Sequence, residues 1–244
     1  TPEFGCGLEG LLKRRAEAAQ LTGILNGIDE SWDPRRLLDT PFDVGAWSER
    51  ARNAEQIRRD FGLAVSRGPL FALVSRLVHQ KGVDLVLSAA DTIVRAGGQL
   101  IVTGKGEERF EAALLAAQRS RPDAIAVRMA FDQREARRIW PGSDFTLMPS
   151  RFEPCGLSQM YAQRFGSLPI GHRTGGLAET IVDDETGFLF SDASVAPFMG
   201  SLCRAFSLFG TKERLSDMRA HAMGQSFSWD ASATSYAGLY ARPA

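Results

Sequence analysis

The stretch LFALVSRLVHQKGVDLVLSAADTIVRAGGQLIVTG, residues 70–104, decides the fold class of this protein. Its apolar run at 70–75 is typical of a buried strand, whereas residues 83–98 place apolar side chains at helical spacing and end in two glycines. A second apolar run follows at 99–104. Because strands joined by a helix pair in parallel through a right-handed crossover, this stretch predicts one βαβ unit of a parallel sheet.

The same alternation of short apolar runs and helical patterns continues along the chain. The further strands that we expect lie at 124–129, 144–149, 168–172 and 187–190. Helices are expected at 107–120, 133–140, 156–166 and 176–182, with only helical sequence beyond residue 193. The pattern predicts an α/β fold, with a doubly wound, Rossmann-like parallel sheet followed by C-terminal helices. In such sheets ligands bind at the carboxyl ends of the strands.

The composition excludes several classes of protein. Hydrophobic residues make up 44% of the 244 residues and charged residues 24%, which is typical of a soluble globular chain. No apolar stretch approaches the roughly 20 residues that span a bilayer, and no secretory leader is recognisable. Basic and acidic residues number 29 each, so a nucleic-acid partner is not favoured. The three cysteines and three histidines are scattered, which favours a reducing cytoplasm and no metal site.

Two glycine-rich stretches invite a nucleotide-binding interpretation. GCGLEG at 5–10 fits the GxGxxG pattern, but only TPEF precedes it, so the strand that a dinucleotide site requires is missing. We interpret this stretch as a turn that enters a helix. TGKGEER at 103–109 joins a strand to a helix and lacks the third glycine, which favours a tight turn over a phosphate contact.

SRLVHQKG, at 75–82, is a stronger signal. Arg76 ends the first strand, and Lys81 stands just before a helix. Two cations beside a helix N-terminus suit a diphosphate, although they could also serve only as a solvated surface. Backbone N–H groups of TGGLAET, at 174–180, could contact a phosphate in the same way, and a plain turn explains that stretch equally well.

SRFEPCGLSQM, at 150–160, follows another predicted strand. Glu153 can only accept hydrogen bonds when ionised, which suits a group of sugar hydroxyls. Pro154 restricts the loop, Gly156 and Leu157 open a helix, and Cys155 is interpreted as a small residue that lines the site. A carboxylate for hydroxyls beside cations for a diphosphate indicates a pocket for a nucleotide sugar.

These stretches, together with GILNGIDESWDP at 23–34 and FSWDASATSYAGLY at 227–240, resemble the C-terminal half of bacterial glycogen synthases and plant starch synthases. The resemblance covers nearly the whole chain. It implies the C-terminal domain of a GT-B glycosyltransferase, a fold with its active site between two Rossmann-like halves. It also implies a retaining, metal-independent transfer of glucose from ADP-glucose to the non-reducing end of an α-1,4-glucan. UDP-glucose remains possible as the donor.

The resemblance also implies site residues. Arg76 and Lys81 would hold the diphosphate, and Glu153 would bind hydroxyls of the transferred glucose, so these three form the catalytic set. Phe131 would stack on the base and Tyr161 would lie near the ribose. The complete donor-binding set that it implies is Asn26, Phe131, Cys155, Gly156, Leu157, Tyr161, Thr174, Gly175 and Gly176.

By the same resemblance, residues 1–28 would be the tail of an N-terminal domain with its hinge, and 29–68 a connector. Residues 69–228 would be the nucleotide-sugar domain, and 229–244 a helix that crosses back to the N-terminal half. The family's lysine-glycine-glycine loop is not found in this sequence, so we expect little or no transferase activity from this chain alone. An exposed last helix would permit a dimer.

Three other interpretations stay open at this point. The chain could be a nucleotide-binding or interaction module without chemistry. It could be another nucleotide-sugar glycosyltransferase of the sucrose synthase type, against which the cysteine of EPCGL argues. A phosphorylase-like pyridoxal enzyme shares the fold class, but no lysine stands at a suitable place late in the sequence.

Overall fold

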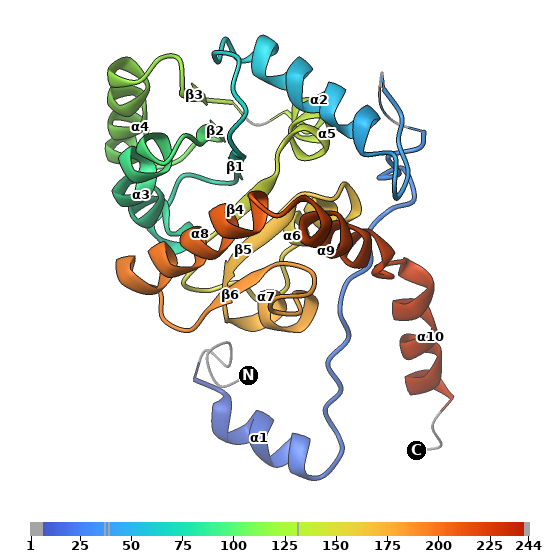
Figure 1. Ribbon diagram of the computed structural model, residues 1–244. Helices are drawn as coiled ribbons and strands as arrows, with labels where there is room; N and C mark the ends of the chain where they lie inside the picture. The colour runs from blue at the N-terminus through green and yellow to red at the C-terminus, as the bar shows by residue number, and fades with distance from the viewer. Residues whose placement is uncertain (1–6, 37, 39, 131, 242–244) are drawn as a thin grey trace.

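The computed structural model describes residues 7–36, 38, 40–130 and 132–241. Within them lies a six-stranded sheet whose strands all pair in parallel, in the order β3-β2-β1-β4-β5-β6 (Figure 1). The strands are β1 (Leu70–Val74), β2 (Gln99–Thr103), β3 (Ile125–Arg128), β4 (Phe145–Met148), β5 (Leu168–His172) and β6 (Phe188–Phe190). The predicted doubly wound sheet is thereby confirmed. The strand order reverses between β1 and β4, which places the topological switch point at the carboxyl ends of these two strands.

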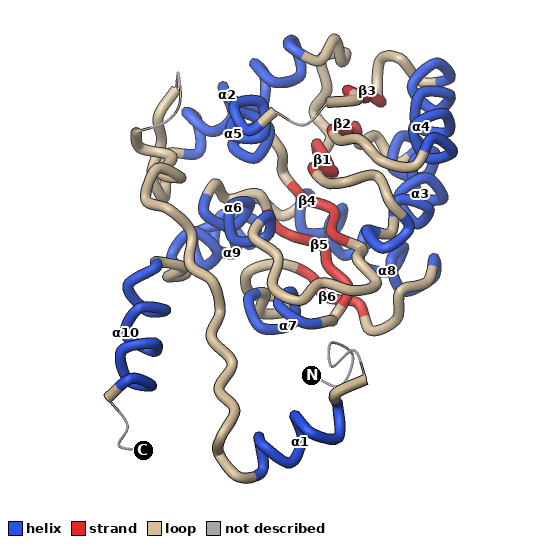
Figure 2. Tube along the Cα trace, turned by 180° about the vertical axis from the view of Figure 1, so that it is seen from behind, coloured by secondary structure: helices blue, strands red, loops and turns tan. Residues whose placement is uncertain are grey.

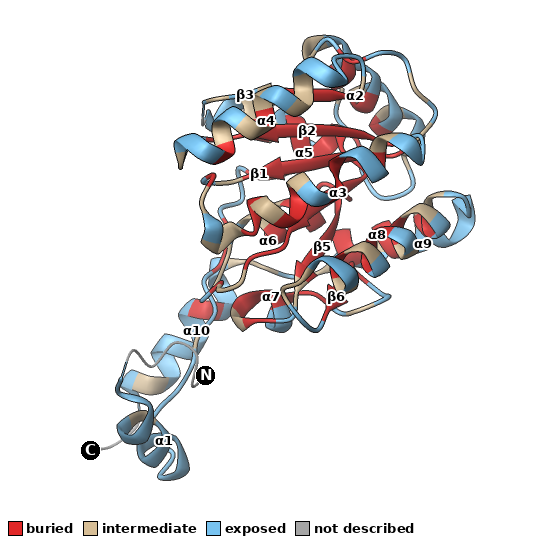
Figure 3. Ribbon diagram, turned by 90° about the vertical axis from the view of Figure 1, so that its left-hand side faces the viewer, coloured by how far each residue is buried: buried red, intermediate tan, exposed pale blue. Residues whose placement is uncertain are grey.

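Helices cover both faces of the sheet. The helices are α1 (Glu9–Glu17), α2 (Trp47–Asp60), α3 (Val83–Arg95), α4 (Glu108–Ser120), α5 (Gln133–Gly142), α6 (Ser158–Arg164), α7 (Gly175–Thr180), α8 (Val195–Phe209), α9 (Lys212–Gly224) and α10 (Trp229–Tyr240), with a 3₁₀ turn, η2, at His79–Lys81. Helices α3, α4 and α8 lie on one side, and α2, α5 and α6 on the other. The sheet is therefore the middle layer of three (Figure 1), and its strands are mostly buried (Figure 3).

Strand β1 shows how the sequence builds the two cores. Phe71 and Leu73 join the cluster under α3, α4 and α8, whereas Leu70, Ala72 and Val74 join the cluster under α2, α5 and α6. Successive side chains of a strand point to opposite faces, so an unbroken apolar run is what a strand buried on both faces requires. Each large side chain buried in this way contributes about 1.5–3 kcal/mol of transfer free energy.

Helix α2 was not identified from the sequence, in which residues 29–68 were interpreted as a connector. The structure has a 14-residue helix there that packs against α5. Its buried residues include Arg50 and Arg58 beside Ala54 and Ile57. Because two of these four inward positions carry charges, the apolar stripe that marks a core-facing helix is broken.

Helices α1 and α10 project away from the sheet (Figures 1 and 2). No residue of α1 is buried, and in α10 only Ser232 is. The extended segment before residue 29 runs to the start of α10, where Ile28 N–H donates to the Phe227 carbonyl (2.7 Å) and Ser232 Oγ donates to the Leu25 carbonyl (2.6 Å). Residues 25–28 and 227–232 are thus joined to each other beside the domain, at the base of the two projecting segments.

A buried ion cluster lies at the amino ends of β1 and β4. Asp144 accepts the backbone N–H of Leu70 (2.8 Å), pairs with Arg219, and lies 3.6 Å from Arg50. Arg50 also donates to the Phe165 carbonyl (3.1 Å) and is buried. Burial lowers the pKa of this guanidinium well below its ordinary value, and the nearby charge of Arg219 lowers it further.

Candidate active site

A pocket of about 210 Å³ lies at the switch point of the sheet, where β1 and β4 end. Five residues expected at the site line it: Arg76, Lys81, Glu153, Gly156 and Leu157. They come from the segments that directly follow β1 and β4, which are 75–82 and 149–157. Side chains separated by more than 70 residues in the sequence therefore meet in one pocket, as the interpretation of a strand-end site requires.

Lys81 and Glu153 form an ion pair at the floor of the pocket. The Lys81 Nζ contacts Glu153 Oε2, and Ser150 Oγ donates a hydrogen bond to the same oxygen (3.0 Å). The Glu153 side chain is 8% exposed and that of Lys81 is 18% exposed. A carboxylate that is buried to this extent needs such partners, so the pair neutralises itself in the absence of a ligand. Ser150 was missed from the sequence, where its hydroxyl had no distinguishing signal.

Arg76 is the unpaired cation of the pocket. Its side chain is exposed, and its guanidinium forms no hydrogen bond or ion pair with the described residues. A free guanidinium beside a neutralised pair gives the pocket one net positive charge. Because guanidinium groups bind phosphate oxygens in bidentate fashion, this charge suits a phosphorylated ligand.

Two glycines let the loops of the pocket approach each other. Gly82 has φ +68°, and a Cβ added to it would lie 2.1 Å from the Pro149 carbonyl oxygen. A Cβ at Gly176 would lie 1.8 Å from the Cys155 carbonyl oxygen. Neither position can hold a side chain without a shift of backbone, so these glycines fix how the loops after β1, β4 and β5 pack together.

The turn at 174–176 uses most of its N–H groups locally. Thr174 N–H donates to the His172 carbonyl (2.8 Å), and Gly176 N–H donates to the Glu153 carbonyl (2.9 Å). Of the three N–H groups in this turn, only that of Gly175 forms no such bond with another described residue. The turn therefore supports the Glu153 loop directly, and it offers a phosphate fewer donors than the sequence interpretation expected. The glycines of TGKG serve loop packing too, because Gly104 and Gly106 lie against the carbonyls of Ser75 and Leu77.

Six described residues of the expected set do not line this pocket: the turn residues Thr174, Gly175 and Gly176, together with Cys155, Tyr161 and Asn26. Cys155 has a free thiol at intermediate exposure and contributes its backbone to the packing with Gly176. Tyr161 stacks on Trp32, with ring centroids 3.9 Å apart, and burial raises the pKa of its hydroxyl. Asn26 is exposed on the segment beside α10. Phe131 lies outside the described residues.

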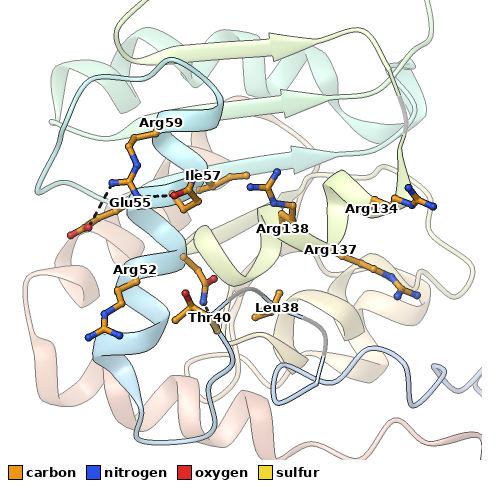
Figure 4. A pocket seen from close by; sticks show the side chains of 11 residues that line it. Leu38, Thr40, Arg52, Glu55, Ile57, Arg59, Arg134, Arg137 and Arg138 are labelled. Carbon is orange, nitrogen blue, oxygen red and sulfur yellow. Dashed lines mark hydrogen bonds and ion pairs between the residues drawn. The ribbon is translucent and has the colours of Figure 1, made fainter.

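A larger hollow, of about 560 Å³, lies between α2 and α5 and shares no residue with the pocket at β1 and β4 (Figure 4). Five arginines line it: Arg52, Arg59, Arg134, Arg137 and Arg138. Three of them already have partners, since Arg138 pairs with Asp60, Arg59 lies 4.0 Å from Glu55, and Arg137 lies over the Trp32 ring. We therefore place the candidate site at the strand ends.

In the described part of the chain, no group of three or more His, Cys, Asp or Glu side chains could hold a metal ion. Of the helices described, none is long and apolar enough to cross a membrane.

The fold and the pocket define a doubly wound α/β domain with two cations and a carboxylate at the switch point of its sheet. Residues 55–214 match the family described as "Glycosyl transferases group 1". The match covers more than half of the chain, which therefore belongs to this family.

Within this family, the chain is similar to glycogen synthases and to a starch synthase. The chain is 65% identical over 242 residues to "Glycogen synthase 1" of Bradyrhizobium diazoefficiens, covering 98% of this chain and 52% of that protein. It is 52% identical to the glycogen synthase of Pseudomonas putida, covering 98% and 47% respectively. A solved structure, the catalytic domain of starch synthase IV from Arabidopsis thaliana bound to ADP and acarbose, superposes with a TM-score of 0.90 at 33% identity, covering 98% of this chain and 52% of that one. The chain spans about half the length of these relatives.

Proposed function

We propose that this chain is the donor-binding half of a glycogen synthase, an enzyme that transfers glucose from ADP-glucose to the non-reducing end of an α-1,4-glucan. The observation that carries the proposal is the meeting of Arg76, Lys81 and Glu153 in one pocket at the switch point of the sheet. The likeness to glycogen synthases and to a starch synthase bound to ADP supports the choice of donor.

In this proposal Arg76 binds the diphosphate first, since its guanidinium has no competing partner in the described chain. Lys81 then turns from Glu153 toward the phosphates, and Glu153 is released to accept hydrogen bonds from hydroxyls of the glucose. Donor binding and sugar recognition are coupled, because the same ion pair must open for both.

The chemical step breaks the bond between C1 of the glucose and the terminal phosphate oxygen, and ADP leaves as an anion. The acceptor's hydroxyl oxygen forms the new bond to C1 on the same face of the sugar, and its proton passes to the leaving phosphate. Arg76 and Lys81 stabilise the negative charge that develops on that phosphate. Two side-chain cations supply this charge, so the proposal includes no metal ion or other cofactor.

The proposal also covers the cellular compartment of the protein and the partner of helix α10. The thiols of Cys155 and Cys203 are free, as is usual for a protein of the reducing bacterial cytoplasm. Trp229, Tyr236 and Tyr240 are exposed on α10, and we propose that this helix packs against another domain or a second copy. A monomeric mass of the 244-residue chain by light scattering would count against the second copy.

Calorimetric titration with ADP and with UDP tests the donor site. We expect ADP to bind more tightly, and Arg76→Ala to weaken ADP binding by about tenfold or more, because a hydrogen-bonded charge contact is removed. The matched control is Arg67→Ala, an exposed arginine without an ion pair, which should leave binding unchanged. Equal effects of the two variants, or a preference for UDP, would contradict the proposal.

Incorporation of glucose from labelled ADP-glucose into glycogen tests the reaction. We expect little or no activity from this chain alone, since all pocket residues come from one domain and transfer needs groups on both sides of the sugar. Ready elongation by the purified chain would overturn that expectation and still support the transferase assignment.

A further inference from the structure

The loops that carry Lys81 and Glu153 are joined by a second ion pair outside the pocket. Arg151 Nη1 donates to Asp84 Oδ1 (2.8 Å), and Arg151 Nη2 donates to Asp84 Oδ2 (2.7 Å). This two-point contact fixes the guanidinium and the carboxylate in one plane. The side chains are 26% and 36% exposed, respectively, so the pair is only partly solvated.

Hydrogen bonds to main-chain carbonyls reinforce the same junction. The Arg151 N–H donates to the Gln80 carbonyl (2.8 Å), and Gln80 Nε2 donates to the Phe152 carbonyl (2.9 Å). Arg151 Nη1 also donates to the His79 carbonyl (2.8 Å). Every one of these bonds joins residues 79–84 to residues 151–152, which directly flank Lys81 and Glu153 in the sequence.

The pKa of Asp84 agrees with this geometry. Burial alone would raise it, but the hydrogen bonds and charge of Arg151 outweigh that effect and hold the pKa below its ordinary value. The carboxylate therefore stays ionised at neutral pH. A surface ion pair with long, mobile side chains would not need this set of backbone partners.

We propose that Arg151 and Asp84 form a latch that positions Lys81 against Glu153, and with it the phosphate and sugar sides of the donor pocket. Both are positioning residues, because neither lines the pocket. The effect on ligand binding rests on the proposed function, whereas the effect on the two loops does not.

Hydrogen–deuterium exchange of the ligand-free chain tests the latch itself. In Asp84→Asn and in Arg151→Ala we expect faster exchange in both 76–82 and 149–157, with β1 and β4 unchanged. A change confined to the loop that carries the substitution, or no change in either loop, would overturn the latch. Asp91→Asn is the matched control, an exposed aspartate on α3 that pairs with Arg95 and Arg121 away from the pocket.

Titration with ADP tests whether the latch acts through Lys81. We expect Arg151→Ala to weaken ADP binding about tenfold in the native background and to have almost no further effect in Lys81→Ala, since coupled residues are not additive. Arg151→Lys, which keeps the charge but loses the fork, should recover part of the affinity. Additive losses, or an equal loss of thermal stability and affinity in all variants, would show a structural role only.

The exchange experiment and the ADP titration together distinguish a failure of the latch from a failure of the donor site. If the native chain does not bind ADP, the proposed function fails in this chain, while the exchange experiment still decides whether the two loops are joined. If the native chain binds ADP and Arg151→Ala binds equally well, the latch does not position the site.

Discussion

The two ends of strands β1 and β4 each hold arginines and a carboxylate, yet they differ in one respect. At the amino ends, Asp144 has two arginines and a backbone N–H around it, and all are buried. At the carboxyl ends, Lys81 and Glu153 neutralise each other while Arg76 stays exposed and unpaired among the described residues. A cluster whose groups are all partnered holds the fold, whereas a spare cation beside an accessible pair leaves room for a ligand.

The largest expected effect tests the amino end. Replacing Asp144 with Ala leaves Arg50 and Arg219 buried without their shared anion, which should lower the free energy of unfolding by about 3–5 kcal/mol. Urea unfolding followed by circular dichroism measures the change. Asp217→Ala, on an exposed carboxylate of α9, should stay within about 0.5 kcal/mol of the native chain. A loss of that small size for Asp144→Ala would mean that the amino-end cluster does not hold the sheet.

The next effect tests how the carboxyl end is shaped. Gly176→Ala brings a methyl group against the Cys155 carbonyl and disturbs the hydrogen bond from Gly176 N–H to Glu153, at a cost of about 1–3 kcal/mol in stability. It should also weaken ADP binding. Gly200→Ala, in open space on α8, should be neutral or gain up to about 1 kcal/mol. If the two variants unfold and bind ADP equally, the close approach of Gly176 to the Cys155 carbonyl does not shape the pocket.

A smaller effect, of unusual sign, tests the self-neutralised pair. Glu153→Gln removes the anion that competes for Lys81, so ADP, which carries no sugar, should bind about three- to fivefold more tightly, within the range of a partly exposed ion pair. The gain should be smaller with ADP-glucose, whose hydroxyls lose their acceptor. Glu179→Gln, on the exposed side of α7, is the control. Weaker ADP binding in Glu153→Gln would show that Glu153 does not compete with the phosphates of ADP for Lys81.

The smallest expected effect is a loss of stability at acidic pH. The N–H of His79 and the Arg109 guanidinium lower the pKa of Glu107, and Arg151 lowers that of Asp84 against the effect of burial. Carboxyls with a lowered folded-state pKa stabilise the protein above their unfolded values, near pH 4, and lose this contribution as the pH falls through the folded pKa. Urea midpoints should therefore fall between pH 5 and about pH 3, and less steeply in Glu107→Gln. Parallel curves for the variant and the native chain would exclude this carboxyl as a contributor.

The sequence predicted the sheet because its strands are buried on both faces and read as unbroken apolar runs. Its pattern could not reveal α2, since Arg50 and Arg58 point inward, and their partners include the Phe165 carbonyl and Gln99, which are 115 and 41 residues away. That Arg76, Lys81 and Glu153 meet in one pocket could be predicted, because their segments follow β1 and β4, which pair with each other in the sheet. The roles of Ser150 and Arg151 could not be predicted, because they depend on which loop packs opposite them in the fold. The N–H groups of the 174–176 turn form hydrogen bonds within the fold, and the residue types alone do not indicate these bonds.

The amino-end cluster also sets an order of events during synthesis. Arg219 stands 75 residues after Asp144, so at ordinary elongation rates Asp144 waits roughly 4–15 seconds on the ribosome before this partner has been made. Through that interval Arg50 can already pair with Asp144, but the hydrogen bond that Arg219 donates to Asp144 Oδ1 is still missing. The nascent domain therefore reaches its final stability only when α9 has emerged, and chaperone binding to stalled chains should drop sharply at that length.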